Sequence, residues 1–178
     1  RRWQKYAGIG MICAEAGEKI ARVSANMAMA ADMEVRASST ATTGAYSSAC
    51  QRGLPAILME RGGGGRFTDS EVQAYKQDVK NIMIRMGLLS GEEVHTVQQK
   101  NVTRAEYLEA ETDGLWYPVF SAGDTFAGGA VLGTVRDIWG NLLLEYRADY
   151  PGIVLYQTVG LGVKTGDPLI AYGEYVDR

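Results

Sequence analysis

The stretch Leu54-Pro55-Ala56-Ile57-Leu58-Met59-Glu60-Arg61-Gly62-Gly63-Gly64-Gly65 joins an apolar run to one carboxylate and four glycines. A continuous apolar run of this length is typical of a strand that is buried on both faces of a mainly parallel sheet. Open α/β sheets bind their ligands at the carboxyl ends of such strands. We therefore expect Glu60 to lie at the end of a buried strand over Leu54 to Met59, and we select it as the candidate catalytic residue.

Glu60 next to Leu58 and Met59 suits a general base, which activates water and then returns the proton as an acid. The structural alternative is an ion pair between Glu60 and Arg61 or Arg66, because a single carboxylate beside arginines is often structural. The residues themselves leave both interpretations open.

The glycines after Glu60 allow the backbone to approach a ligand closely. Their N–H groups could bind an anion, and the flanking arginines could pair with a substrate carboxylate. Arg61, Gly62, Gly63 and Arg66 are therefore candidate substrate-binding residues, while a simple chain reversal with solvated arginines explains the same sequence. The Lys-Ser/Thr ending of a nucleotide-binding Walker loop does not follow the glycines.

Helical patterns lie on both sides of this stretch. Thr68 and Glu71 form a capping box, and the apolar spacing from Val72 to Met86 predicts a helix that Gly87 ends. A short helix is expected from Gly44 to Gln51. The Ala, Met, Glu and Lys content from Trp3 to Met33 predicts one helix or two, and Met33 to Arg36 fits a short strand.

The composition becomes polar from Leu88 to Glu111, where we place a linker or excursion. Short apolar segments between glycine turns then predict an all-β module, with strands over 116–120, 131–135, 142–146, 153–159 and 169–172. We predict three parts: 1–90 as part of an α/β domain, 91–111 as the linker, and 112–178 as a small β domain.

Composition excludes several classes of function. The 178 residues carry a formal net charge of -3 with no basic run, so nothing indicates nucleic-acid binding. No apolar stretch approaches the roughly 20 residues of a membrane span, and two unspaced cysteines favour a reducing cytoplasm. One histidine, His95, and the cysteines Cys13 and Cys50 are too few to complete a metal site in this chain.

Three stretches together resemble the C-terminal portion of the succinylglutamate desuccinylase/aspartoacylase family, which is related to zinc carboxypeptidases. The first runs from Thr43-Gly44 to Met59-Glu60-Arg61-Gly62-Gly63, and the second is the helix that ends in Met86-Gly87-Leu88-Leu89. The third comprises Gly114-Leu115-Trp116-Tyr117-Pro118, Gly123-Asp124, Tyr150-Pro151-Gly152 and Thr165-Gly166-Asp167-Pro168-Leu169. They cover roughly Ala41 to Gly173.

The resemblance implies a zinc-dependent hydrolase that cleaves the amide bond of N-acyl amino acids, in which Glu60 acts on zinc-bound water. The family's zinc ligands, an HxxE pair and a later histidine, lie upstream of the matched portion, and this sequence contains neither. The resemblance therefore implies that zinc binds to a missing N-terminal half of the parent protein and that this chain alone is inactive.

Other functions fit parts of the sequence. One alternative is a non-enzymatic binding or assembly module, and another is peptide hydrolysis by a metallocarboxypeptidase-like parent. The β module also resembles the barrel-sandwich fold of biotinyl and lipoyl carriers, but its turn Arg136-Asp137-Ile138-Trp139-Gly140-Asn141 lacks the modified lysine. A structural role for this module, or a contact in a homo-oligomer, is the better expectation.

Overall fold

A computed structural model of the protein describes residues 4–13 and 17–177. Three helices are present in these ranges: α1 (Glu18–Ala30), α2 (Ala45–Gln51) and α3 (Asp69–Arg85). The strands are β1 (Gln4–Cys13), β2 (Val35–Ser39), β3 (Ile57–Gly63), β4 (Lys100–Glu109), β5 (Gly114–Pro118), β6 (Thr125–Phe126), β7 (Val131–Arg136), β8 (Leu142–Arg147), β9 (Gly152–Thr158), β10 (Gly162–Val163) and β11 (Pro168–Asp177). The structure is mixed α/β, as the sequence predicts.

The chain forms two compact units. The α/β unit contains residues 8–13, 17–61, 67–102 and 176–177, and the β unit contains residues 4–7, 62–66 and 103–175. Both units are therefore built from separate pieces of sequence. The predicted serial domains 1–90, 91–111 and 112–178 stay a prediction.

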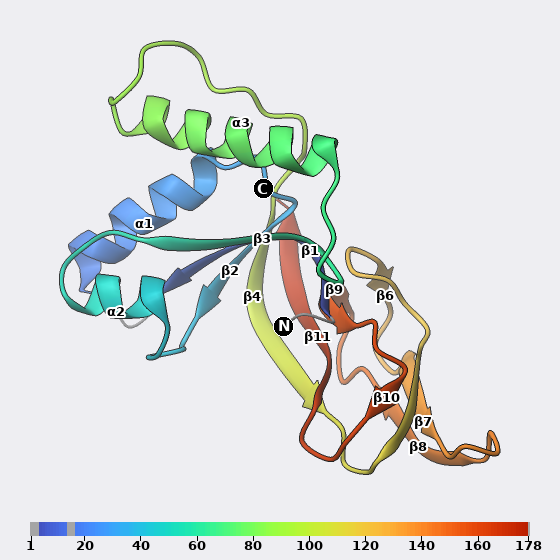
Figure 1. Ribbon diagram of the computed structural model, residues 1–178. Helices are drawn as coiled ribbons and strands as arrows, with labels where there is room; N and C mark the ends of the chain where they lie inside the picture. Colours follow the sequence, from blue (N-terminus) through green and yellow to red (C-terminus); the bar gives the residue numbers. More distant parts are fainter. Residues whose placement is uncertain (1–3, 14–16, 178) are drawn as a thin grey trace. The chain divides into compact units, whose positions relative to one another are not determined.

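The α/β unit is built on strands in the order β3-β1-β2-β4 (Figure 1). β1 pairs with β2 in parallel, with Ile9 opposite Val35, and β2 pairs with β4 in parallel, with Arg36 opposite Asn101. Alternate residues of β2, such as Val35 and Ala37, are buried. Helices α1 and α3 lie side by side in this unit (Figure 1).

The prediction of helix from Trp3 to Met33 is wrong over its first part. Gln4–Cys13 is strand β1, and only Glu18–Ala30 is helical; Trp3 and residues 14–16 lie outside the described residues. Gln4–Cys13 itself contains two glycines and two isoleucines, so the helix-favouring Ala, Met, Glu and Lys content lies mainly after Gly17, and the segment pairs with β2 instead. The short strand expected at Met33 to Arg36 is present as β2, which runs from Val35 to Ser39.

Strand β3 also differs from its prediction. It spans Ile57–Gly63, so Glu60 lies in the middle of the strand rather than at its end. All seven residues are only half-buried, and Leu54 is 62% exposed, so the predicted burial on both faces is wrong. The reason is that β3 is the terminal strand of its unit, with β1 as its neighbour.

Helices α2 and α3 match the predicted segments. The Thr68 hydroxyl accepts a hydrogen bond from the Glu71 N–H, and the Glu71 carboxylate accepts one from the Thr68 N–H, which completes the predicted capping box. The fully buried residues of α3 are Asp78 and Asn81. Val79, from the predicted apolar face, is 47% exposed, so the apolar spacing does not mark the buried face of this helix.

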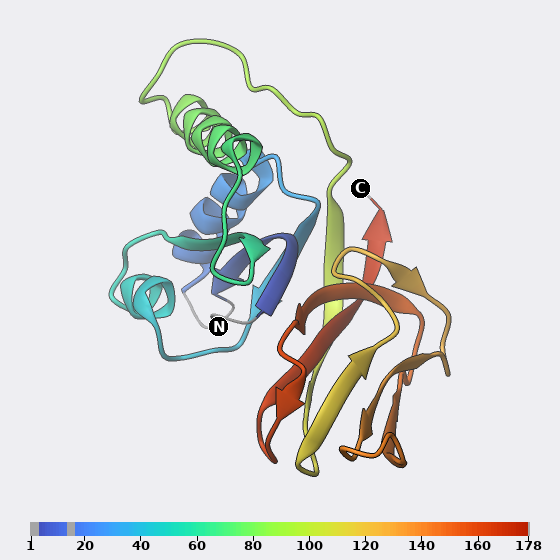
Figure 2. The ribbon, with the colours of Figure 1, turned by 45° about the vertical axis from the view of Figure 1, so that its right-hand side comes forward.

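The β unit contains two groups of strands (Figure 2). One has the order β11-β9-β6, and the other is an antiparallel sheet in the order β10-β5-β7-β8. Their apolar core includes Trp116, Leu132, Val135 and Tyr172, all at most 2% exposed. The five predicted β strands correspond to β5, β7, β8, β9 and β11. The barrel-sandwich description of this unit stays a prediction.

The predicted linker over 91–111 is only partly irregular. Its second half is strand β4, Lys100–Glu109, a ten-residue strand with only Val102 fully buried. A strand with so little burial does not need the alternation of apolar and polar residues by which strands are usually recognised. Its polar composition therefore resembled that of a linker. No helix in the described ranges is both long and apolar enough to cross a membrane.

Candidate active site around Glu60

Tyr75 of α3 fixes the backbone on both sides of Glu60. The Arg61 N–H donates a hydrogen bond to the Tyr75 hydroxyl oxygen at 2.8 Å, and the same hydroxyl donates to the Met59 carbonyl at 3.3 Å. Burial raises the pKa of Tyr75, and the negative charge of Glu60 adds to this increase. The half-buried Glu60 therefore lies close enough to Tyr75 for its charge to raise the pKa of the phenol.

The Arg61 side chain forms an ion pair with Asp78, one helical turn beyond Tyr75. Its Nε donates to Asp78 Oδ2 at 3.0 Å, and its second terminal nitrogen donates to Oδ1 at 3.0 Å and to Oδ2 at 2.8 Å. The Asp78 side chain is 0% exposed and that of Arg61 is 16% exposed. The Arg61 guanidinium is thus mostly shielded from solvent, unlike the exposed setting considered from the sequence.

The segment after α1 completes this network. Arg61 donates to the Asp32 carbonyl at 2.7 Å, and the Asp32 N–H donates to Asp78 Oδ1 at 2.8 Å. Burial opposes ionisation of the Asp32 carboxyl, but hydrogen bonds from Thr96 and Val97 outweigh it and lower the pKa of Asp32. Asp32 and Asp78 therefore connect β3, α3 and the segment before β4.

Gly8 of β1 leaves room for the same guanidinium. Its φ is +55°, and a Cβ added there would lie 3.5 Å from a terminal nitrogen of Arg61. Because an L side chain rarely adopts this φ, the glycine permits a local backbone shape that a larger residue would strain. The surroundings of Arg61 are those of a structural ion pair, and its predicted contact with substrate stays a prediction.

Polar side chains of α3 also hold the segment that follows it. Asn81 donates to the Val94 carbonyl at 2.7 Å and accepts from the Val94 N–H at 3.0 Å. Arg85 forms an ion pair with Glu93, and the Glu93 carboxylate also lies 3.0 Å from His95 Nε2. These bonds lower the pKa of the Glu93 carboxyl, chiefly through Arg85. His95 therefore takes part in a surface hydrogen-bond cluster beside the Arg85–Glu93 ion pair.

The other predicted substrate-binding residues, Gly62, Gly63 and Arg66, are grouped with the β unit. Gly62 has a φ of +66°, and the Arg66 N–H donates to the Gly63 carbonyl at 3.2 Å, which closes a tight turn. Helix α3 begins only at Asp69, and its capping box already binds the Thr68 and Glu71 N–H groups. The turn explains the glycines as a chain reversal, and anion binding by them stays a prediction.

The residues needed for a zinc site do not come together in the described ranges. Within them, no group of three His, Cys, Asp or Glu residues could hold a metal ion. Cys50 is buried, its sulfur lies 3.7 Å from the Ser24 hydroxyl oxygen, and its thiol donates to the Ala56 carbonyl. The described residues alone therefore do not fit a zinc centre.

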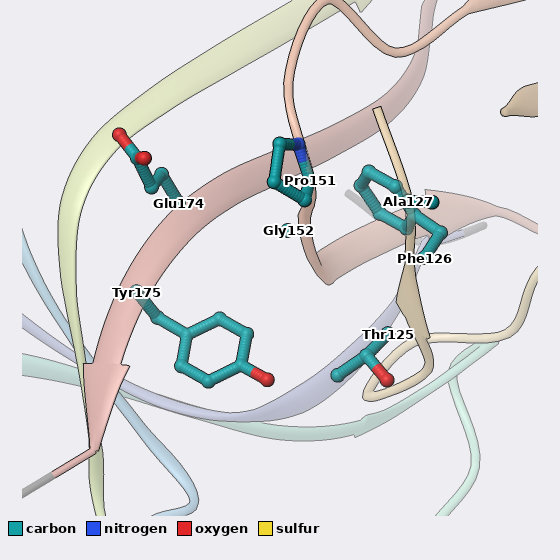
Figure 3. Close-up of a pocket in the computed structure, with 7 residues that line it drawn as sticks. All are labelled: Thr125, Phe126, Ala127, Pro151, Gly152, Glu174 and Tyr175. Carbon is teal, nitrogen blue, oxygen red and sulfur yellow. The ribbon is translucent and has the colours of Figure 1, made fainter. Parts of the chain in front are cut away.

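A surface pocket lies in the β unit (Figure 3). It has a volume of about 620 Å³, and its lining includes Thr125, Phe126, Pro151 and Tyr175. The Tyr175 hydroxyl points toward Thr125 in this view, whereas the adjacent Glu174 side chain points away (Figure 3). None of the predicted site residues lines this pocket.

Sequence reasoning missed Tyr75, Asp78 and Asp32. Tyr75 counted only as one of the regularly spaced apolar residues of α3, and Asp78 was given no role. The available signal was spacing: positions 75 and 78 are three residues apart and share one face of a helix. Their partners lie 14 and 17 residues earlier in β3, and local spacing carries no information on such contacts.

The fold matches solved structures over nearly the whole chain, although no protein-family model and no curated protein matches the sequence. The product-bound ectoine utilization protein EutE (DoeB) from Ruegeria pomeroyi matches 96% of this chain and 54% of its own, with 20% identity and a TM-score of 0.84. A succinylglutamate desuccinylase from Silicibacter sp. TM1040 matches 97% and 55%, with 21% identity and a TM-score of 0.83. A succinylglutamate desuccinylase/aspartoacylase from Rhodobacter sphaeroides matches 99% and 56%, with 21% identity and a TM-score of 0.83. The chain thus has the fold found in solved structures of the succinylglutamate desuccinylase/aspartoacylase family, and it spans about half the length of the proteins it matches.

Proposed function

We propose that the chain is the C-terminal portion of a hydrolase that cleaves the amide bond of N-acyl amino acids. The observation that carries this proposal is the match of 97–99% of this chain to structures with desuccinylase or aspartoacylase names. The carboxylate selected independently from the sequence, Glu60, lies in the same matched region. The proposal places the remainder of the enzyme before residue 1.

Glu60 is the proposed proton acceptor and donor of the reaction. It would take a proton from the attacking water and return it to the leaving amine, which requires its carboxylate to stay in one place through both steps. The hydrogen bonds of Tyr75 to Met59 and Arg61 restrict the backbone that carries this carboxylate. A half-buried carboxylate on a backbone fixed at both neighbours suits such a task.

The proposal includes zinc as the cofactor of the complete protein, with ligands upstream of residue 1. The described residues provide no zinc site of their own, so the chain's contribution to catalysis would be Glu60 and the residues that hold it. This division predicts that the isolated chain does not hydrolyse N-acyl amino acids. It also predicts that the complete protein binds zinc equally well with or without the Glu60 carboxylate.

The test is hydrolysis by the complete protein, measured as release of the free amino acid from a panel of N-succinyl, N-acetyl and other N-acyl amino acids. Peptides with a free C-terminus form the comparison panel. Hydrolysis of acylated amino acids supports the proposal. Cleavage of the peptides alone would replace it with the carboxypeptidase-like alternative.

Replacement of Glu60 tests the assigned residue. Glu60→Gln should reduce kcat by about 10²- to 10⁴-fold, the usual contribution of general acid–base catalysis, while bound zinc is unchanged. Glu92→Gln is the matched control, because it removes the same charge from an exposed residue of the same unit. Near-normal turnover by the Glu60 variant would exclude the proposed role.

A further inference from the structure

We propose that Tyr75 is a positioning residue for Glu60, acting through the two peptide groups that flank this glutamate. This inference rests on the proposed function of Glu60, and no sequence pattern indicated it. Helix α3 would thus fix the position of Glu60 on strand β3, which has β1 on one side and, among the described residues of the α/β unit, no strand on the other.

Tyr75 makes one hydrogen bond to the residue on each side of Glu60. The carbonyl of Met59 and the N–H of Arg61 point to the same edge of β3, because backbone groups of alternate residues in a strand share one edge. A parallel neighbouring strand would bind such a pair with the N–H and C=O of one residue. The Tyr75 hydroxyl does the same with its proton and its oxygen, at 3.3 Å and 2.8 Å. It therefore replaces a neighbouring strand at Glu60.

Helix α3 holds Arg61 at two points. Tyr75 and Asp78 lie one turn apart on α3, and both hold residue 61, the first at its N–H and the second at its guanidinium. Asp78 is fully buried, and its Oδ1 also accepts a hydrogen bond from the Asp32 N–H. Two bonds to one residue limit both its translation and its rotation. The backbone beside Glu60 is thus held by a partly buried network that ends on the fully buried Asp78, and by more than one contact.

The Tyr75 phenol also interacts electrostatically with the Glu60 carboxylate. The charge of Glu60 contributes to the raised pKa of Tyr75, so the phenol and the carboxylate lie within electrostatic range. A hydroxyl at this place can hold Glu60 without neutralising it, since its proton is donated to the Met59 carbonyl. Tyr75 thereby restricts the backbone of Glu60 without donating its own proton to the carboxylate.

The test compares Tyr75→Phe with Tyr46→Phe in the complete protein. The first variant removes only the hydroxyl that bridges residues 59 and 61, and the second removes a tyrosine hydroxyl from α2 in the same unit. Small misplacements of catalytic groups can cost up to about 10²-fold in rate, so we expect kcat to fall about 10- to 100-fold in Tyr75→Phe. We expect KM to stay within about twofold of the wild-type value, because Tyr75 contacts the backbone beside Glu60 and has no proposed contact with the substrate.

A second measurement does not depend on activity. Hydrogen exchange at the Arg61 amide reports the bond to Tyr75 directly, and it should be at least about fivefold faster in Tyr75→Phe. Exchange at this amide should be unchanged in Tyr46→Phe. Unchanged exchange in Tyr75→Phe would show that the bridge does not hold this backbone and would overturn the inference.

The outcomes separate this inference from the proposed function. If Glu60→Gln is inactive while Tyr75→Phe keeps wild-type kcat, the role of Glu60 stands and the positioning role of Tyr75 is refuted. If Glu60→Gln is fully active, the proposed function fails, and the positioning role fails with it. An equal fall of kcat in Tyr75→Phe and Tyr46→Phe would identify a general loss of stability and would also overturn the inference.

Discussion

Asp78→Asn tests the buried ion pair that supports Glu60. The substitution keeps the shape of the side chain but removes its charge, and it places an amide N–H₂ group within reach of the Arg61 guanidinium. Arg61 would then be a cation whose side chain is 16% exposed and lacks its counterion. Breaking a buried pair by removing one partner typically costs about 3–5 kcal/mol.

The size of the effect follows from the contacts. Asp78 accepts three hydrogen bonds from Arg61 and one from the Asp32 N–H, so the substitution weakens the connection of α3 to two other segments. With an m-value of about 2 kcal/mol/M in urea, a loss of about 3–5 kcal/mol lowers the unfolding midpoint by about 1.5–2.5 M. Urea unfolding of the wild-type and variant proteins, followed by circular dichroism, measures this shift.

Two further variants control the experiment. Asp69→Asn removes an exposed charge from the first turn of the same helix, and we expect a loss of at most about 1 kcal/mol. The double variant Arg61→Met with Asp78→Leu replaces the pair by apolar side chains and should recover much of the stability. A midpoint for Asp78→Asn within about 0.5 M of the wild type would refute the view that this pair holds the site.

Two predictions concern the β unit. Gly133→Ala should destabilise the protein by about 1–3 kcal/mol or more in urea unfolding, because the added Cβ would lie 2.3 Å from the buried Trp116 ring; wild-type stability would contradict the packing described. Tyr150→Phe should raise the free energy of unfolding by about 1 kcal/mol at neutral pH, because the Tyr150 hydroxyl is buried without a hydrogen-bond partner in the described part of the chain. Burial also raises the pKa of Tyr150 to about 12, so its contribution to stability is complete below the unfolded value of about 10 and is lost as the pH rises toward 12. The stability of Tyr150→Phe should therefore fall less than that of the wild type over this range, and equal slopes would argue against the raised pKa.

Local signals were sufficient for several elements. The capping box of Thr68 and Glu71 predicted the start of α3, and the glycine turns predicted the five longer strands of the β unit after residue 112. These signals work because the residues that determine the structure are close together in the sequence. They also placed Glu60 on a strand, although not in its middle.

The remaining elements depend on distant contacts. Strand β1 pairs with β2 about 26 residues later in the sequence, and local spacing carries no information on that pairing. The buried side of α3 carries Asp78 and Asn81, whose partners Arg61 and Val94 lie on either side of the helix in sequence. Hydrophobic periodicity assumes that apolar residues are the buried ones, so it cannot identify a helix face that is buried through ion pairs and amide hydrogen bonds.

The same limit applies to the candidate site. Glu60 was selected because a carboxylate between an apolar strand and glycines is unusual. Arg61 became a candidate substrate-binding residue only because it lies next to Glu60 and the glycines in the sequence. In the structure, Arg61 faces Asp78 and Gly8. The orientation of the Arg61 side chain depends on Asp78, 17 residues later, and the sequence alone does not reveal that contact.

The decisive experiment measures kcat of Glu60→Gln for hydrolysis of an N-acyl amino acid by the complete protein, with Glu92→Gln measured beside it. We expect a fall of about 10²-fold or more in kcat with unchanged zinc content for Glu60→Gln, and wild-type turnover for Glu92→Gln. Turnover by Glu60→Gln within about twofold of the wild type would contradict the role assigned to this carboxylate.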